Sequence, residues 1–156
     1  MSLSLVTDRT QSDYDSWLLL SKIPWSQMTT EQKAAWSAPL KGAYNYTDLN
    51  RVGTAVIALQ SIFTGLGYSV SVSVRTNYTA GEWPSQSDMV SYIQSINNIR
   101  AAITVFSATP SAPSSIDDGT VFIWNDIEQI LLDVEMLINN MKAAWSYSGE
   151  IFSGEA

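Results

Sequence analysis

The sequence predicts a mainly α-helical protein, a bundle of three long helices preceded by two short ones. Hydrophobic residues make up 46% of its 156 residues and charged residues only 15%, so the chain is long and apolar enough to bury a core. Apolar residues recur at helical spacing in three long stretches, whereas residues 68–75 show the clearest strand alternation. We expect one globular domain, with an N-terminal arm at 1–46, a helical core at 47–146 and an extended C-terminal tail at 147–156.

Capping boxes mark the two short helices of the N-terminal arm. Thr10 and Asp13 stand three residues apart, as do Thr29 and Gln32, which is the spacing of side chains that cap a helix start. Ahead of them, residues 2–7 alternate between serine or threonine and apolar side chains over a short distance, which predicts a short strand.

Three long helices are predicted from Thr47 to about residue 66, from Ser85 to about residue 107, and from Thr120 to Trp145. The last carries a broad apolar stripe that includes Val134, and the substitution Val134→Asp is therefore predicted to unfold the protein. A thinner apolar stripe on its other side includes Leu132 and Met136. We expect this helix to lie between two layers or to lend one face to another subunit.

Residues 68–75 read YSVSVSVR, with tyrosine and valines on one face and serines and arginine on the other. This pattern predicts a strand, or one arm of a small hairpin, that is buried on one side and wet on the other. A lone strand leaves its main-chain groups unpaired, so it needs a partner. The candidates are residues 2–7, the segment around Tyr78, or the same strand of another subunit.

The composition excludes several kinds of function. Fifteen carboxylates against eight Lys and Arg give a net charge of −7, which disfavours binding to nucleic acid or to anionic membranes. The absence of cysteine and histidine removes disulfides, the usual zinc ligands and nucleophiles activated by histidine. Neither a signal peptide nor an apolar run of membrane-spanning length is evident. We therefore expect a soluble, non-enzymatic protein without metal, cofactor, nucleic-acid partner or membrane.

Four carboxylates lie on the longest predicted helix, at Asp126, Glu128, Asp133 and Glu135. Glycosidases need two carboxylates that face each other across a cleft, not along one helix edge. These four are therefore predicted to form a solvated helix face.

Two further features have structural explanations. Asp117, Asp118 and Gly119 resemble part of a calcium loop but lack its remaining ligands, so they are predicted to cap the following helix. Arg100 falls within an apolar stripe, and a cation there needs a partner, for which Glu128 is the predicted residue.

Apolar side chains outside the predicted core are the candidate interaction surface. Tyr78 and Trp83 lie in a loop, where aromatic rings can stack on sugars. Ile151 and Phe152 lie in the predicted tail. The surface also includes the second stripe of the longest helix, with Leu132 and Met136.

Several stretches, in order, resemble a module that recurs in structural proteins of bacteriophages and prophages of Gram-positive bacteria. They are DRTQSDYDSW, KGAYNYTDLNRVGTAV, RTNYTAGEWPSQSDMVSYIQSINNIRAA, NDIEQILLDVEMLINNM and YSGEIFSGE. The resemblance implies a tail or baseplate component that resides in the virion, and in the host cytoplasm during assembly. Its implied partners are other virion proteins and further copies of itself. The alternative is a glycan- or receptor-binding module that contacts the host surface, and members of this family commonly carry tryptophan where this chain has Tyr78.

Overall fold

A computed structural model describes residues 2–38, 40–82, 84–115 and 121–153, with side chains through residue 146. Within these residues the protein is all-α, and its three longer helices pack together as predicted. In chain order the elements are α1 (Gln11–Ser21), the short 3₁₀ helix η1 (Trp25–Gln27), α2 (Thr30–Ser37), α3 (Tyr46–Gly65), α4 (Gln86–Ala101) and α5 (Val121–Ser153).

The predicted helix starts are largely confirmed. Thr10 and Thr29 cap α1 and α2 through reciprocal bonds with the residues three positions on, and Ser85 caps α4 in the same way. Asn45 caps α3, so that helix begins one residue earlier than expected. Thr120, the predicted start of the last helix, lies outside the described residues.

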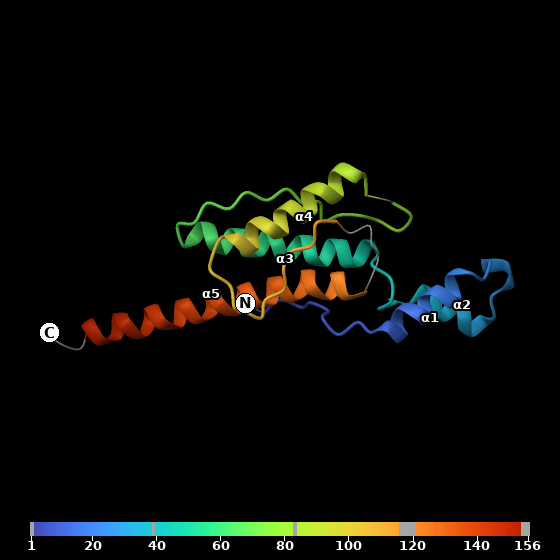
Figure 1. The fold of residues 1–156 in the computed structure, drawn as a ribbon, viewed down its shortest axis with the longest axis horizontal. Helices are drawn as coiled ribbons and strands as arrows, with labels where there is room; N and C mark the ends of the chain where they lie inside the picture. Colours follow the sequence, from blue (N-terminus) through green and yellow to red (C-terminus); the bar gives the residue numbers. More distant parts are fainter. Residues whose placement is uncertain (1, 39, 83, 116–120, 154–156) are drawn as a thin grey trace.

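The helices α3, α4 and α5 all run in the same direction, as Figure 1 shows. Each connection between them must therefore travel back along the length of the bundle. The chain from α3 to α4 does so as a long extended segment (Figure 1). Between the helices lies one apolar core, whose largest fully buried side chains include Phe63, Leu59, Ile96, Ile99, Ile127 and Ile130.

The strand or hairpin predicted at 68–75 is not formed, and the described residues contain no β-strand. The alternation was nevertheless informative, because Val70 is buried, Val72 and Val74 are partly buried and the serines between them are exposed. The segment is extended and half-buried, but it lies against helices and not beside another strand.

Helix side chains bond the main chain of this return segment (residues 68–78), where a sheet would supply another backbone. The main-chain nitrogen of Ser73 donates to Oγ of Ser95 on α4 at 2.8 Å, and that hydroxyl can also donate to the carbonyl of Ser73 at 3.2 Å. On α3, Asn50 donates from Nδ2 to the carbonyl of Tyr78 and accepts from its N–H through Oδ1, both at 2.8 Å. These bonds satisfy polar groups that a strand partner would otherwise have to satisfy.

The C-terminal tail expected at 147–156 is not extended over its described part, because α5 continues to Ser153. The helix continues through Gly149, because one interior glycine costs only about 1 kcal/mol relative to alanine. In Figure 1 the last turns of α5 project beyond the bundle at one end, while α1 and α2 lie at the opposite end.

Candidate functional site

The N-terminal strap (residues 2–9) lies along α5 in the opposite direction to the helix. The main-chain nitrogen of Leu3 donates to both carboxylate oxygens of Glu135, at 3.1 and 3.0 Å. Two helical turns earlier on α5, Glu128 accepts from the main-chain nitrogen of Val6 at 2.6 Å. The short strand predicted at 2–7 is therefore absent, and helix carboxylates take the place of a strand partner.

Asn125 closes the other end of the strap at Arg9. Its Oδ1 accepts from the main-chain nitrogen of Arg9 at 3.1 Å, and its Nδ2 donates to the carbonyl of Arg9 at 2.8 Å. This is the pattern that Asn50 makes with Tyr78. An asparagine side chain presents one donor and one acceptor, so it can pair with one residue of an extended chain as a neighbouring strand would.

The side chain of Arg9 enters a buried charge cluster, which consists of Arg9, Asp48, Arg51 and Glu128. Its NH2 lies 3.0 Å from Asp48 Oδ1 and 2.7 Å from Glu128 Oε1. Arg51 reaches the same two oxygens, at 2.5 and 2.7 Å, and also donates from Nε to Glu128 Oε2. Two guanidinium groups thus balance two carboxylates, and each carboxylate contacts both guanidinium groups.

The balance of positive and negative charge in this cluster matters for stability because Glu128 and Arg9 are buried. Glu128 is 0% exposed and Arg9 is 3% exposed, so neither charge has water to solvate it. Removing one member of a buried ion pair leaves an uncompensated charge, which costs several kcal/mol. Burial alone lowers the pKa of Arg51, but the hydrogen bond and the charge of Glu128 outweigh this effect and leave that pKa above its ordinary value.

Aromatic rings line the cluster. The guanidinium carbon of Arg9 lies 5.5 Å from the centre of the Tyr44 ring, and Tyr44 stacks on Trp124 with 5.3 Å between ring centres. The hydroxyls of Tyr44 and Tyr92 are 2.6 Å apart. Burial raises the pKa of Tyr44, and the negative charge of Glu128 raises it further; burial likewise raises the pKa of Tyr92. Both phenols therefore stay protonated at neutral pH.

The carboxylates of α5 do not form the predicted solvated face, since Glu128, Asp133 and Glu135 are buried. Glu128 and Glu135 hold the strap, and Asp133 accepts hydrogen bonds from Thr109 Oγ1 at 2.6 Å and from Gln129 Nε2 at 2.7 Å. The spacing of Glu128 and Glu135 in the sequence could have suggested that these two carboxylates are buried. Glu128 and Glu135 are seven residues apart, on the helix edge that carries buried Leu131.

The predicted pair between Arg100 and Glu128 is wrong. Arg100 donates from Nε to the carbonyl of Pro110 at 2.8 Å, so it holds the loop after its own helix. Glu128 is paired instead with Arg51 and with Arg9, which is 119 residues away in the chain. Nothing in the spacing of single residues reveals a contact between segments that far apart.

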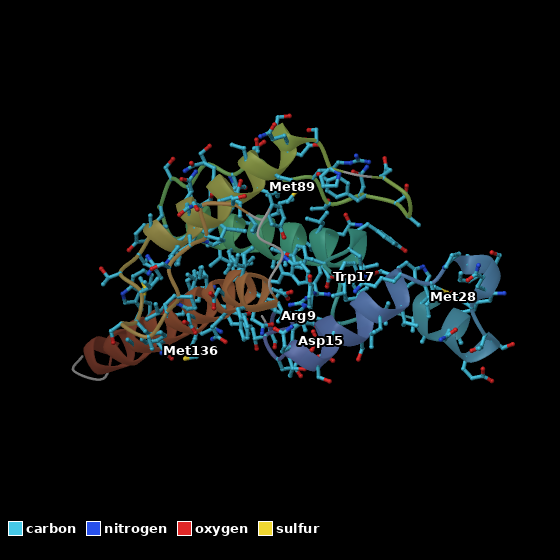
Figure 2. All side chains as sticks on the ribbon, turned by 45° about the vertical axis from the view of Figure 1, so that its right-hand side comes forward. Arg9, Asp15, Trp17, Met28, Met89 and Met136 are labelled. Carbon is cyan, nitrogen blue, oxygen red and sulfur yellow. The ribbon has the colours of Figure 1, made fainter. Side chains whose placement is uncertain are left out.

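Of the residues predicted as an interaction surface, the structure describes the side chains of Tyr78, Leu132 and Met136. Tyr78 is only 5% exposed, and the guanidinium carbon of Arg75 lies 4.5 Å from its ring centre, so the ring packs into the body. On α5, Leu132 is partly buried and Met136 is 50% exposed; Figure 2 shows Met136 on the side of α5 away from α4. Trp83 and the Asp117–Asp118–Gly119 stretch lie outside the described residues, and so do the side chains of Ile151 and Phe152.

A groove of about 590 Å³ runs beside the strap. Residues 2–5 form one wall, and α3 forms the other with Thr47, Asn50, Arg51, Thr54, Ala55 and Ala58. Residues 2–5 of the strap therefore border this open groove, whereas Arg9 at its other end is buried.

The fold and this site define an all-α protein whose extended segments are fastened by helix side chains. Comparison with protein-family models, curated proteins and solved structures found no match. Across the described residues, no cluster of His, Cys, Asp and Glu is suited to hold a metal ion. In that same part of the chain, no helix combines the length and apolar character needed to cross a membrane.

Proposed function

We propose that this protein is a structural interaction module of a bacteriophage particle, associated with the tail or baseplate. Its work is to pack against copies of itself and other virion proteins, and not to catalyse a reaction. The resemblance of several sequence stretches to phage structural proteins supports the proposal, and the form of α5 supports it independently.

The observation that carries the proposal is the length of α5. It has 33 residues, against 20 in α3 and 16 in α4. At 1.5 Å per residue, α5 is about 50 Å long and α3 about 30 Å long. The last part of α5 therefore extends past the helices that cover its first part (Figure 1).

The row of core side chains continues onto this projecting part. Val134 and Ile138 are buried, Met141 is partly buried and Trp145 is 51% exposed, at successive steps of four, three and four residues. This is the spacing of one helix face. A neighbouring helix from another subunit could cover the row just as α3 and α4 cover its earlier part.

Exposed apolar side chains also occur at the opposite end of the molecule. Leu19 of α1 and Trp25 of η1 are both more than half exposed. A long body with apolar surface at both ends is suited to contact neighbours on two sides, as a component of an assembled particle must.

Mass spectrometry of purified particles tests the proposal. Particles induced from the source strain should contain this chain at a level stoichiometric with known tail proteins. Trp145→Lys should reduce incorporation of the chain, whereas Asn140→Lys, an exposed position on the other side of α5, should not. Intact particles that lack the chain would contradict the proposed function.

A further inference from the structure

We infer that the corner where the end of the strap meets the first turn of α5 is an internal hydration site, in which bound water accepts hydrogen bonds from Arg9 and Trp124. Two enclosed donors at this corner, Nε of Arg9 and Nε1 of Trp124, donate to none of the described residues. Arg9 is 3% exposed and Trp124 is 7% exposed. The inference rests on these two side chains and their surroundings and does not depend on the proposed function.

Arg9 and Trp124 are neighbours at this corner, and Figure 2 shows Arg9 where the strap meets the body. Asn125, the residue after Trp124, pairs with both main-chain polar groups of Arg9. Glu128 receives NH2 of Arg9 at 2.7 Å and lies four residues after Trp124, on the same face of α5. The Arg9 side chain therefore runs from Asn125 to Glu128, alongside the first turn of the helix. The ring centre of Tyr44 lies 5.5 Å from the guanidinium carbon of Arg9 and 5.3 Å from the ring centre of Trp124.

The carboxylates of the buried charge cluster are already in use as acceptors. Each carboxylate oxygen of Glu128 accepts two hydrogen bonds. Oδ1 of Asp48 accepts from the guanidinium groups of both Arg9 and Arg51. Within the described residues, Nε of Arg9 and Nε1 of Trp124 are therefore left as donors that need a further acceptor.

Water is the acceptor that the chemistry of this corner favours. Buried polar groups in native proteins are nearly always hydrogen-bonded, either to protein or to ordered water. The two positive and two negative charges of the cluster already balance, so an anion would add an uncompensated buried charge. A water molecule brings no net charge, and its oxygen accepts from two donors. Tyr44 beside the site is only partly buried, which places the corner near the surface that water must cross.

The site is complete only while the strap is in place, because Arg9 belongs to the strap and Trp124 to α5. The bound water is thereby part of the joint between the two segments. Since both donor atoms are enclosed, this water should exchange with solvent slowly, and its release should accompany opening of the strap.

A crystal structure of the unaltered protein, from crystals grown in bromide, tests the site. It should place a water oxygen about 2.7–3.2 Å from Nε1 of Trp124 and from Nε of Arg9. Bonds from both nitrogens to protein atoms, with no water between them, would overturn the inference. An anomalous bromide peak at the same place would also overturn it, because the site would then bind an anion.

Nuclear magnetic resonance tests the same site in solution. Trp124→Phe identifies the indole signal of Trp124 among the six tryptophans. In the unaltered protein that N–H should show a rotating-frame Overhauser effect to water with the sign of a dipolar contact, and not of hydrogen exchange. The indole of Trp25, which is 54% exposed, is the control and should show no contact with a long-lived water. Absence of the dipolar effect at Trp124 would overturn the inference.

Discussion

Glu128 on α5 accepts a hydrogen bond from the main-chain nitrogen of Val6 at 2.6 Å, although the two residues are 122 positions apart. The same carboxylate contacts Arg9 and Arg51, so one buried side chain holds both the backbone and the charge of the strap. The N-terminal segment is thereby made part of the bundle without forming a strand or a helix.

Replacing Glu128 with glutamine should strongly destabilise the protein. The change keeps the size of the side chain but leaves Arg9 and Arg51 with only the carboxylate of Asp48. Removing one partner from a buried ion pair costs about 3–5 kcal/mol. Urea denaturation followed by circular dichroism measures the change in the free energy of unfolding.

Asp126→Asn is the matched control on the same helix. Burial raises the pKa of Asp126, which means that its environment disfavours the charged form. Removing this charge should leave the free energy of unfolding unchanged or slightly increased. If the two variants unfold at the same urea concentration, the cluster around Glu128 has no special role.

Ser95→Ala should loosen the return segment while leaving α4 intact. Ser95 is buried and its hydroxyl accepts from the main-chain nitrogen of Ser73, so its loss removes a hydrogen bond worth about 0.5–1.5 kcal/mol. Amide exchange at Ser73 should accelerate, whereas Ser91→Ala, one turn earlier on α4, should leave it unchanged. Unaltered exchange at Ser73 in the Ser95→Ala protein would contradict this role.

Gly42→Ala should displace α1 from its place beside the body. A Cβ at Gly42 would lie 2.0 Å from the carbonyl oxygen of Asp13, and main chain cannot move aside as a flexible side chain does. Gly65→Ala, at the end of α3, meets nothing within 4 Å and should be neutral or stabilising. Thermal unfolding of both variants separates the effects, and equal melting temperatures would show that α1 is not fixed at this point.

Tyr92, which is buried, and Tyr44, which is partly buried, predict loss of stability at alkaline pH. Burial raises the pKa of Tyr44 and Tyr92 above the ordinary value of 10.0, so the folded protein holds these protons more tightly than the unfolded chain. Their contribution to stability is complete below about pH 10 and decreases as the pH rises further. Urea denaturation between about pH 9 and pH 11 should show this decrease, and Tyr44→Phe should make it shallower. The same slope in both proteins would mean that Tyr44 ionises alike in the folded and unfolded states.

Much of the fold could be predicted because the sequence signals of a helix lie within a few residues of one another. Capping boxes at Thr10, Thr29 and Ser85 and the apolar stripes of α3, α4 and α5 depend on residues a few positions apart. The alternation of residues 68–75 correctly indicated that Val70, Val72 and Val74 turn toward the body, although Tyr68 in the same register is exposed. It could not show what bonds the backbone, because Ser95 and Asn50 lie on other segments.

The contacts between the strap and α5 could not be predicted either, because they also join residues that are far apart in the sequence. Glu128 and Arg9 become partners only when the strap lies along α5, and a carboxylate on a helix edge usually faces water. The direction shared by α3, α4 and α5 has no local signature either. That arrangement explains why the chain needs long extended segments, which helix side chains then fasten.

Amide hydrogen exchange in the strap is the most direct test of this account. The N–H groups of Leu3, Val6 and Arg9 donate to side chains of α5, whereas those of Ser4 and Leu5 have no partner among the described residues. Nuclear magnetic resonance of the unaltered protein should therefore find slow exchange at residues 3, 6 and 9 and fast exchange at residues 4 and 5. Uniformly fast exchange from residue 2 to residue 9 would show that the strap is not held by the carboxylates and asparagine of α5.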